Sequence, residues 1–170
     1  MVALFALVST ASATGVRGNT TLKLDPNTAG ALTSLGVAVA PVAPATAGTS
    51  GISFPITGAT GSLHPLAGTI NHSGGLTFSK GATVVPLTDY SIVIGSNPRL
   101  IASVGAARVA ILKLNLSQAR IGASWNGLTI SNVKATLTAE AAGALNGAFA
   151  TTAFTAGLPI GVAAVNLRLF

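Results

Sequence analysis

The chain has 170 residues, 49% apolar and only 7% charged, a composition that predicts one domain with a full hydrophobic core and excludes intrinsic disorder. Nine basic and three acidic residues give a net charge of +6. Because the basic residues stand singly, without interleaved aromatics, we expect no nucleic-acid partner. They are either solvated charges on strand faces or a source of weak attraction to an anionic cell envelope. The chain has no cysteine, which excludes disulfides and thiolate sites, and no apolar run of about 18 residues, so we expect no transmembrane segment.

The first residues have the pattern of a targeting segment. Residues 1–8 are apolar, and Ala11 and Ala13 frame a small-x-small site that a signal peptidase accepts. We therefore interpret residues 1–13 as a signal peptide, truncated because a basic start is missing, and residues 14–170 as a single domain. An N-terminal strand is the alternative. Export predicts a secreted or cell-envelope location.

Two short helices are expected. Asp25 can cap the free N–H groups of the first, and Pro26 suits its first position. Gly36 is expected to end this helix. Thr138 has the same capping role in a second segment rich in small residues, where Gly147 is expected to be the end.

The rest of the chain has the pattern of short strands, divided by glycine, proline or Asn-Gly. Asn126 and Gly127 predict a two-residue hairpin turn with positive φ angles. The pattern indicates a sandwich or barrel, and we expect a mainly β fold: an antiparallel β-sandwich-like domain with two short α-helices. The expected strands are residues 20–24, 37–42, 52–56, 67–72, 76–79, 83–85, 89–94, 100–104, 108–115, 119–124, 128–131, 134–138 and 160–169.

The sequence has few residues of the types that carry out catalysis, with three acidic residues, two histidines and no cysteine. Asp25 and Glu140 are assigned to helix starts, which leaves Asp89 as a single carboxylate, whereas glycosidases need two. The sequence has no Gly-x-Ser-x-Gly elbow, and two histidines without cysteine cannot complete a zinc site. We therefore expect a protein that is not an enzyme, with no catalytic and no metal-binding residues.

The most distinctive segment is residues 68–78, where His72 precedes a turn at Ser73-Gly74. His72 is either a turn residue hydrogen-bonded to backbone or a residue that binds a ligand. Tyr90 is either a half-buried strand residue or a second contact. His72 and Tyr90 are therefore the candidate ligand-binding residues.

Five stretches together match the pattern of a known domain family: Phe54-Pro55, the His-x-Gly-x-Leu block within residues 68–76, residues 97–100, residues 135–141 and Ala156-Gly157. Over residues 51–165 the chain thus resembles the HtaA domain family of exported actinobacterial haem-uptake proteins. The resemblance implies a β-rich fold with two short helices, and haem as the ligand of a tyrosine supported by the histidine at the position of His72. The family's tyrosine lies ahead of this histidine, whereas residues 14–71 contain none and Tyr90 follows it.

Two functions follow from this reading. The first is an exported cell-envelope domain that binds haem or another small hydrophobic ligand at His72, without the usual tyrosine. The alternative is a structural or adhesive envelope domain with no small-molecule ligand. An aromatic-lined groove at His72 would favour the first function, and a filled, flat surface there would favour the second.

Overall fold

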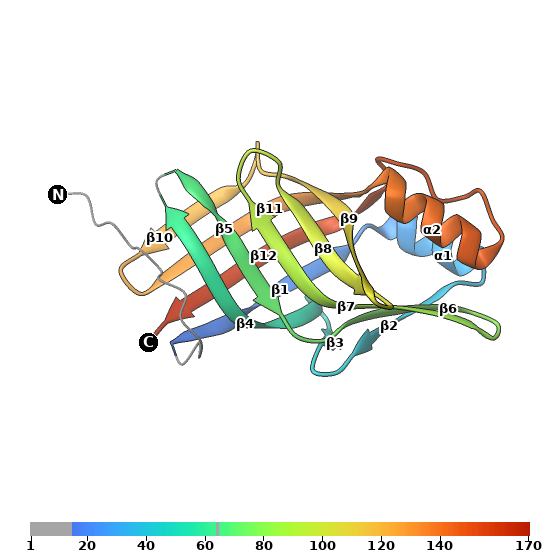
Figure 1. Ribbon diagram of the computed structural model, residues 1–170, viewed down its shortest axis with the longest axis horizontal. Coiled ribbons are helices and arrows are strands. Elements are labelled where there is room, and N and C mark those ends of the chain that lie inside the picture. The colour runs from blue at the N-terminus through green and yellow to red at the C-terminus, as the bar shows by residue number, and fades with distance from the viewer. Residues whose placement is uncertain (1–14, 64) are drawn as a thin grey trace.

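The computed structural model describes residues 15–63 and 65–170, most of which lie in strands (Figure 1). The predicted targeting segment and His64 lie outside the described residues. The elements, in chain order, are β1 (Val16–Leu24), α1 (Pro26–Ser34), β2 (Ala38–Val42), β3 (Thr46–Gly48), β4 (Gly51–Leu63), β5 (Leu66–His72), β6 (Gly75–Lys80), β7 (Thr83–Ile94), β8 (Arg99–Val104), β9 (Ala107–Asn115), β10 (Arg120–Ser124), β11 (Gly127–Leu137), α2 (Ala139–Phe149) and β12 (Pro159–Leu169).

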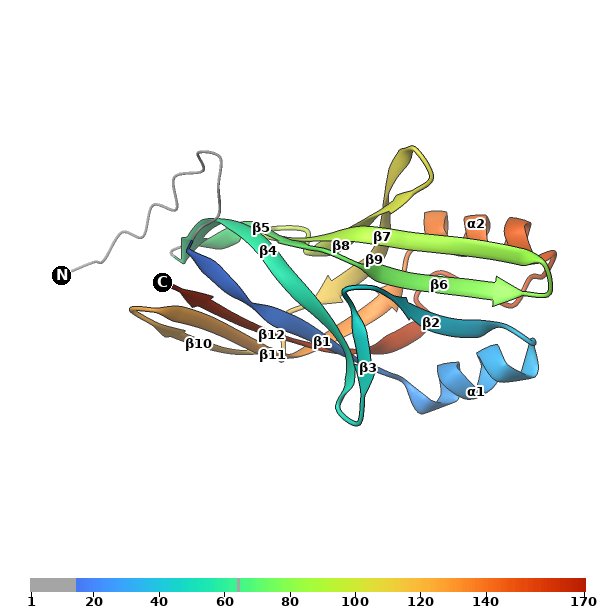
Figure 2. The ribbon, with the colours of Figure 1, turned by 90° about the horizontal axis from the view of Figure 1, so that it is seen from below.

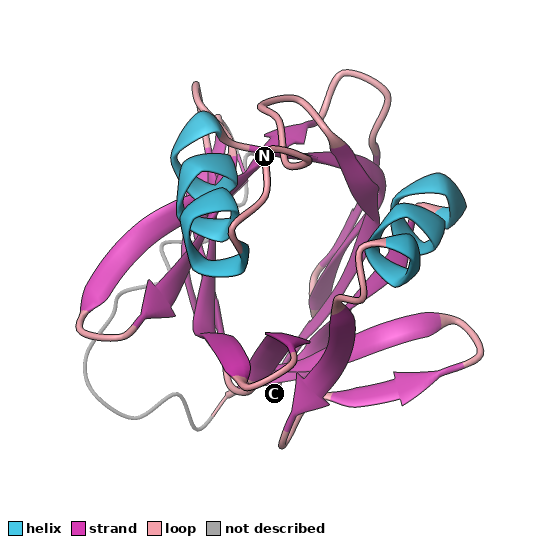
Figure 3. Cartoon of the chain, turned by 90° about the vertical axis from the view of Figure 1, so that its right-hand side faces the viewer, coloured by secondary structure: helices cyan, strands magenta, loops and turns pink. Residues whose placement is uncertain are grey.

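The strands form one antiparallel sheet that closes on itself. Its order is β7-β5-β4-β1-β12-β11-β9-β8, and β8 pairs back with β7. Closure leaves these eight strands without an unpaired edge. The predicted mainly β, sandwich-like antiparallel domain with two short helices is confirmed. Closure into a barrel-like sheet, with α1 and α2 beside one opening, is what the structure adds (Figure 3).

Four strands lie off the closed ring. β6 pairs with β7 and β2 with β6, while β10 pairs with β11 and β3 with β4. β2, β6 and residues 83–88 of β7 form an arm that extends past the ring beside the two helices (Figure 2). None of the helices among residues 15–63 and 65–170 is long and apolar enough to cross a bilayer.

Both helices begin where the sequence predicts. The Asp25 side chain accepts hydrogen bonds from the backbone N–H groups of Asn27 and Thr28, at 3.0 and 3.2 Å. Pro26 follows as the first helical residue, and Gly36 has the positive φ of a helix stop. These ends were predictable because capping is local chemistry.

The predicted end of α2 at Gly147 is wrong. The Thr138 side chain caps the helix start as expected, by accepting from Ala141 N–H at 3.1 Å. The helix continues to the buried Phe149, whose ring lies 6.3 Å from that of Phe154. Tertiary packing of Phe149 therefore extends the helix by two residues beyond the glycine.

Two pairs of predicted strands are single long strands. Residues 83–85 and 89–94 belong to β7, which bends at Asp89, where φ is +53°. Residues 128–131 and 134–137 belong to β11, where Asn132 has φ +59° and the register with β12 shifts. Asp and Asn tolerate this backbone conformation, so the strand is bulged and not broken.

The β10–β11 hairpin forms as predicted but with a different turn. Ser124 pairs with Gly127, so the two turn residues are Trp125 and Asn126. Neither has a positive φ, so the Asn-Gly explanation of this turn is wrong. The Trp125 side chain projects from the tip of the hairpin, 80% exposed.

Candidate ligand-binding site

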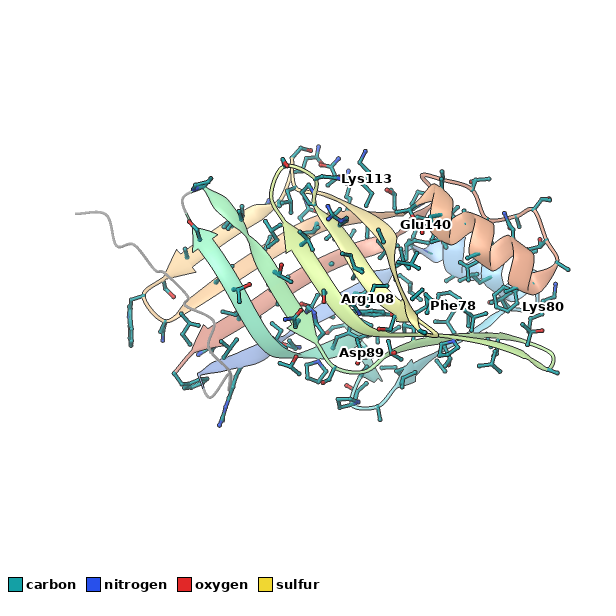
Figure 4. The ribbon with its side chains drawn as sticks, viewed as in Figure 1. Phe78, Lys80, Asp89, Arg108, Lys113 and Glu140 are labelled. Atoms are coloured by element: carbon teal, nitrogen blue, oxygen red, sulfur yellow. The ribbon has the colours of Figure 1, made fainter. Side chains whose placement is uncertain are left out.

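A cavity of about 100 Å³ lies inside the closed sheet and extends toward the helices. Aliphatic and phenylalanine side chains form nearly all of its wall, and the polar residues in that wall are Thr20, Thr28, His72 and Tyr90. Of the residues that line it, Ala144 of α2 is exposed and Phe78 of the arm is half-buried, so we take their side as its open end. Phe78 is labelled in Figure 4. The cavity is therefore apolar along its length.

His72 is the last residue of β5 and is only 5% exposed. Its Nε2 lies 2.7 Å from Thr20 Oγ1 of β1, and its Nδ1 lies 3.2 Å from the carbonyl oxygen of Tyr90 in β7. Because a carbonyl only accepts, we assign the proton to Nδ1, so that the Thr20 hydroxyl donates to Nε2. Both nitrogens of the neutral ring are then hydrogen-bonded.

The environment of His72 favours this neutral form. Burial lowers the pKa of His72 from 6.5 to about 4, and hydrogen bonds with the backbone of Tyr90 and Ile70 oppose part of that change. At neutral pH the imidazole is therefore uncharged. The His72 side of the cavity presents a weakly polar surface and no net charge.

Tyr90 lies beside His72 and is 4% exposed. Its ring centre lies 5.1 Å from that of Phe54, with the planes tilted by 56°. Burial raises the pKa of Tyr90 above its usual value, and a hydrogen bond with the Leu76 backbone opposes part of that change. The phenol is therefore protonated at neutral pH.

The turn after His72 requires a glycine at position 74. Gly74 has φ +80°, and a Cβ there would lie 2.6 Å from the carbonyl oxygen of Val42. The Gly74 carbonyl accepts a hydrogen bond from Asp89 N–H at 3.0 Å. Gly74 thereby joins the end of β5 to the bend in β7.

Arg108 holds the same bend from the outer surface. Its guanidinium donates to the Asp89 carbonyl and to the hydroxyls of Ser91 and Ser103. The Ser91 hydroxyl donates in turn to Asn71 Oδ1 at 2.8 Å. Arg108 and Asp89 lie together on the face of the sheet drawn in Figure 4. These bonds link β9, β8, β7 and β5 behind the candidate site residues.

The structure brings the two predicted site residues into one cavity wall. His72 is hydrogen-bonded to backbone, as the turn-residue interpretation expects, and it also lines a cavity, as the ligand-site interpretation expects. Sequence reasoning missed Thr20 and Phe54, which pair across β1 and β4. The available signal for Thr20 was its place in a strand that alternates inward with Leu22.

The fold and cavity define a class: a mainly β domain whose closed antiparallel sheet surrounds an apolar cavity flanked by two short helices. Among solved structures, the C-terminal domain of HtaA from Corynebacterium glutamicum is similar, with a TM-score of 0.71, 16% identity, and coverage of 92% of this chain and 99% of that chain. The N-terminal domain of HtaA gives a TM-score of 0.64 and 15% identity over 95% and 99%.

The haem-binding protein HtaB from the same bacterium gives a TM-score of 0.58 and 9% identity over 92% of this chain and 94% of that chain. The predicted resemblance to HtaA domains is thus confirmed as a distant one, at the level of the fold. No protein-family model and no curated protein matches the chain.

The described residues around the cavity do not fit haem, the group named for HtaB. A cavity of about 100 Å³ is smaller than the roughly 300–1,000 Å³ of typical ligand pockets. His72 has both nitrogens engaged and Tyr90 is a buried neutral phenol, so neither offers iron a free donor. No lysine or arginine among the described residues lines the cavity to meet the haem carboxylates.

Proposed function

We propose that this chain is a non-catalytic binding domain whose cavity takes one short apolar chain, either a small ligand or the end of a larger one. The observation that carries the proposal is an apolar cavity of about 100 Å³ with an open end. An unfilled apolar cavity of this size costs about 2 kcal/mol of stability, at roughly 24 cal/mol per Å³. A ligand that fills it would recover much of that free energy.

The size of the cavity sets the class of ligand. An engineered cavity of about 150 Å³ holds benzene, so about 100 Å³ accommodates a chain of a few carbons. The wall suits an uncharged apolar group, because its polar side chains are already hydrogen-bonded to one another or to backbone. These are His72, Thr20, Tyr90 and Thr28, the last donating to the Pro159 carbonyl. Any polar part of a larger ligand would remain at the open end.

Titration with straight-chain alcohols, followed by NMR of the protein methyl groups, tests this function. Affinity should rise about fourfold per added carbon from butanol to hexanol, since each buried CH₂ contributes about 0.8 kcal/mol. The rise should stop at octanol, when the cavity is full. Linear, non-saturable shifts along the whole series would contradict the proposal and favour the structural or adhesive alternative.

A pair of variants on α2 makes the test specific. Ala144 lines the open end of the cavity, whereas Ala148 is exposed on the same helix and does not line it. Ala144→Leu should abolish saturable binding by occluding the entrance, and Ala148→Leu should leave it unchanged. Equal effects of the two variants would place binding elsewhere.

We also propose that the domain acts outside the cytoplasm, at the cell envelope. Support comes from the small-x-small site at Ala11 and Ala13, which follows the apolar residues 1–8. N-terminal sequencing of the native protein from the culture medium or envelope fraction should then begin near Thr14. Recovery of the chain from Met1 in the cytosolic fraction would contradict export.

A further inference from the structure

Two aromatic side chains are almost fully exposed at the end of the molecule opposite the helices. Trp125 is 80% exposed and Phe170 is 78% exposed. Isolated exposed apolar residues are ordinary, but neighbouring large ones are not. These two residues, with Arg17 and Arg168 described below, are called the aromatic end.

Backbone pairing shows that these residues are close neighbours. Leu169 N–H donates to the carbonyl of Asn126, the residue after Trp125, at 2.9 Å. Phe170 N–H donates to the Gly15 carbonyl at 2.8 Å. In Figure 1 the β10–β11 turn and the C-terminus lie at the left, and α1 and α2 lie at the right. The aromatic end is therefore remote from the open end of the cavity.

Two arginines lie beside these aromatic side chains. Arg17 of β1 pairs directly with Arg168 of β12, and both are exposed. The Arg17 guanidinium lies over the Phe170 ring, 5.2 Å from its centre. Like charges on directly opposed strand positions are destabilising. The pairing of Arg17 with Arg168 therefore creates a local positive charge that a negative surface would neutralise.

The acidic residues do not neutralise this charge. Asp25 follows the opposite end of β1, Glu140 lies in the first turn of α2, and Asp89 lies at the bend of β7. No other carboxylate side chain occurs in the sequence. The aromatic end thus combines exposed Trp and Phe with arginines that no acidic side chain neutralises.

We propose that the aromatic end docks on an anionic lipid bilayer. Tryptophan is enriched at the level of lipid headgroups because its ring is amphipathic. Arginine binds phosphate through paired, charge-assisted hydrogen bonds. Trp125 and Phe170 enter the headgroup region, and Arg17 and Arg168 contact lipid phosphates. In this orientation the open end of the cavity faces away from the membrane. The inference is independent of the ligand proposed for the cavity.

The full chain provides its own probe, because Trp125 is its one tryptophan. Addition of phosphatidylglycerol-containing vesicles should shift its emission to shorter wavelength and sediment the protein. Pure phosphatidylcholine vesicles should do neither, and added salt should weaken the binding to anionic vesicles. Emission that is already blue-shifted without vesicles, and that vesicles leave unchanged, would overturn the proposal, because the aromatic end would then be covered by the protein itself.

Variants separate a specific surface from general charge attraction. Arg17→Gln and Arg168→Gln should each weaken sedimentation with anionic vesicles about fivefold, as expected for one basic residue near an anionic surface. Trp125→Ala should weaken it further. Lys80→Gln removes the same charge at the opposite end of the molecule (Figure 4) and should have no effect.

Two further outcomes would overturn the proposal. Equal weakening by Lys80→Gln and Arg168→Gln would mean attraction by net charge alone. An equal blue shift with soluble polyglutamate would mean that the partner is a polyanion and not a bilayer. Circular dichroism should show unchanged folding in all these variants, because Arg17, Trp125 and Arg168 are exposed and the half-buried Lys80 is the last residue of its strand.

Discussion

Lowering the pH from neutral to about 4 should destabilise the protein through His72. In the folded protein the pKa of His72 is lowered from 6.5 to about 4, chiefly by burial. Between these two values the unfolded chain binds a proton that the folded protein does not bind. The free energy of unfolding therefore increases with pH across this interval and decreases as the solution is acidified.

The magnitude follows from the two pKa values. At about 1.4 kcal/mol per pH unit, full protonation of the unfolded chain costs about 3 kcal/mol of stability. His72 is 5% exposed, so solvent screening removes little of this effect. A loss of this size is a large share of the stability of a small domain.

Urea unfolding followed by far-ultraviolet circular dichroism, at several pH values between 7.5 and 4, measures this loss. His72→Gln keeps a hydrogen-bonding side chain but does not titrate, so its free energy of unfolding should fall less than that of the wild type, with the difference approaching about 3 kcal/mol. Effects of pH on every other group are common to both proteins and cancel in that difference. Parallel curves for the two proteins would refute the reasoning, as would an NMR titration of the His72 ring with a midpoint near 6.5.

Four other predictions concern separate parts of the structure. Thr138→Ala should cost about 1 kcal/mol in urea unfolding, because it removes the α2 cap, and no loss would mean that the cap contributes nothing. Gly74→Ala should cost more than about 2 kcal/mol, because its Cβ would meet the Val42 carbonyl. Gly81 also has a positive φ but open space around it, so Gly81→Ala should cost less. Equal losses of stability in the two variants would mean that the contact with the Val42 carbonyl has no effect. Above about pH 10 the stability should decrease as the unfolded chain ionises at Tyr90, and Tyr90→Phe should remove that decrease. Titration with ferric haem, followed by Soret absorption, should give no tight complex. A high-affinity complex that Tyr90→Phe abolishes would mean that the buried, hydrogen-bonded phenol of Tyr90 can bind iron after all.

Local chemistry explains which predictions from the sequence succeeded. Asp25 and Thr138 bond to N–H groups two or three residues away, so both helix starts could be read from the chain. The end of α2 could not, because the burial of Phe149 against Phe154 continues the helix past Gly147. Helix starts are set by neighbours in sequence, whereas this end is set by a contact in space.

Strand continuity and turn type depended on pairing. Asp89 and Asn132 each interrupt the alternation of a strand, and alternation alone does not distinguish a bulge from a break. Pairing of Ser124 with Gly127 selected Trp125 and Asn126 as the turn residues. Register is defined by the pairing of two strands, so the sequence of one strand alone does not predict it.

The sequence by itself determined the class of fold, the scarcity of catalytic groups, and His72 and Tyr90 as the residues to examine. The tertiary structure alone decided that these two residues share a cavity wall with Thr20, which is 52 residues from His72. It also decided that the sheet closes by pairing β7 with β8, and that Trp125 and Phe170 meet at one end with Arg17. Residue type and local spacing control propensity and capping, but contacts between distant segments arise only when burial of the whole apolar surface selects one arrangement of strands.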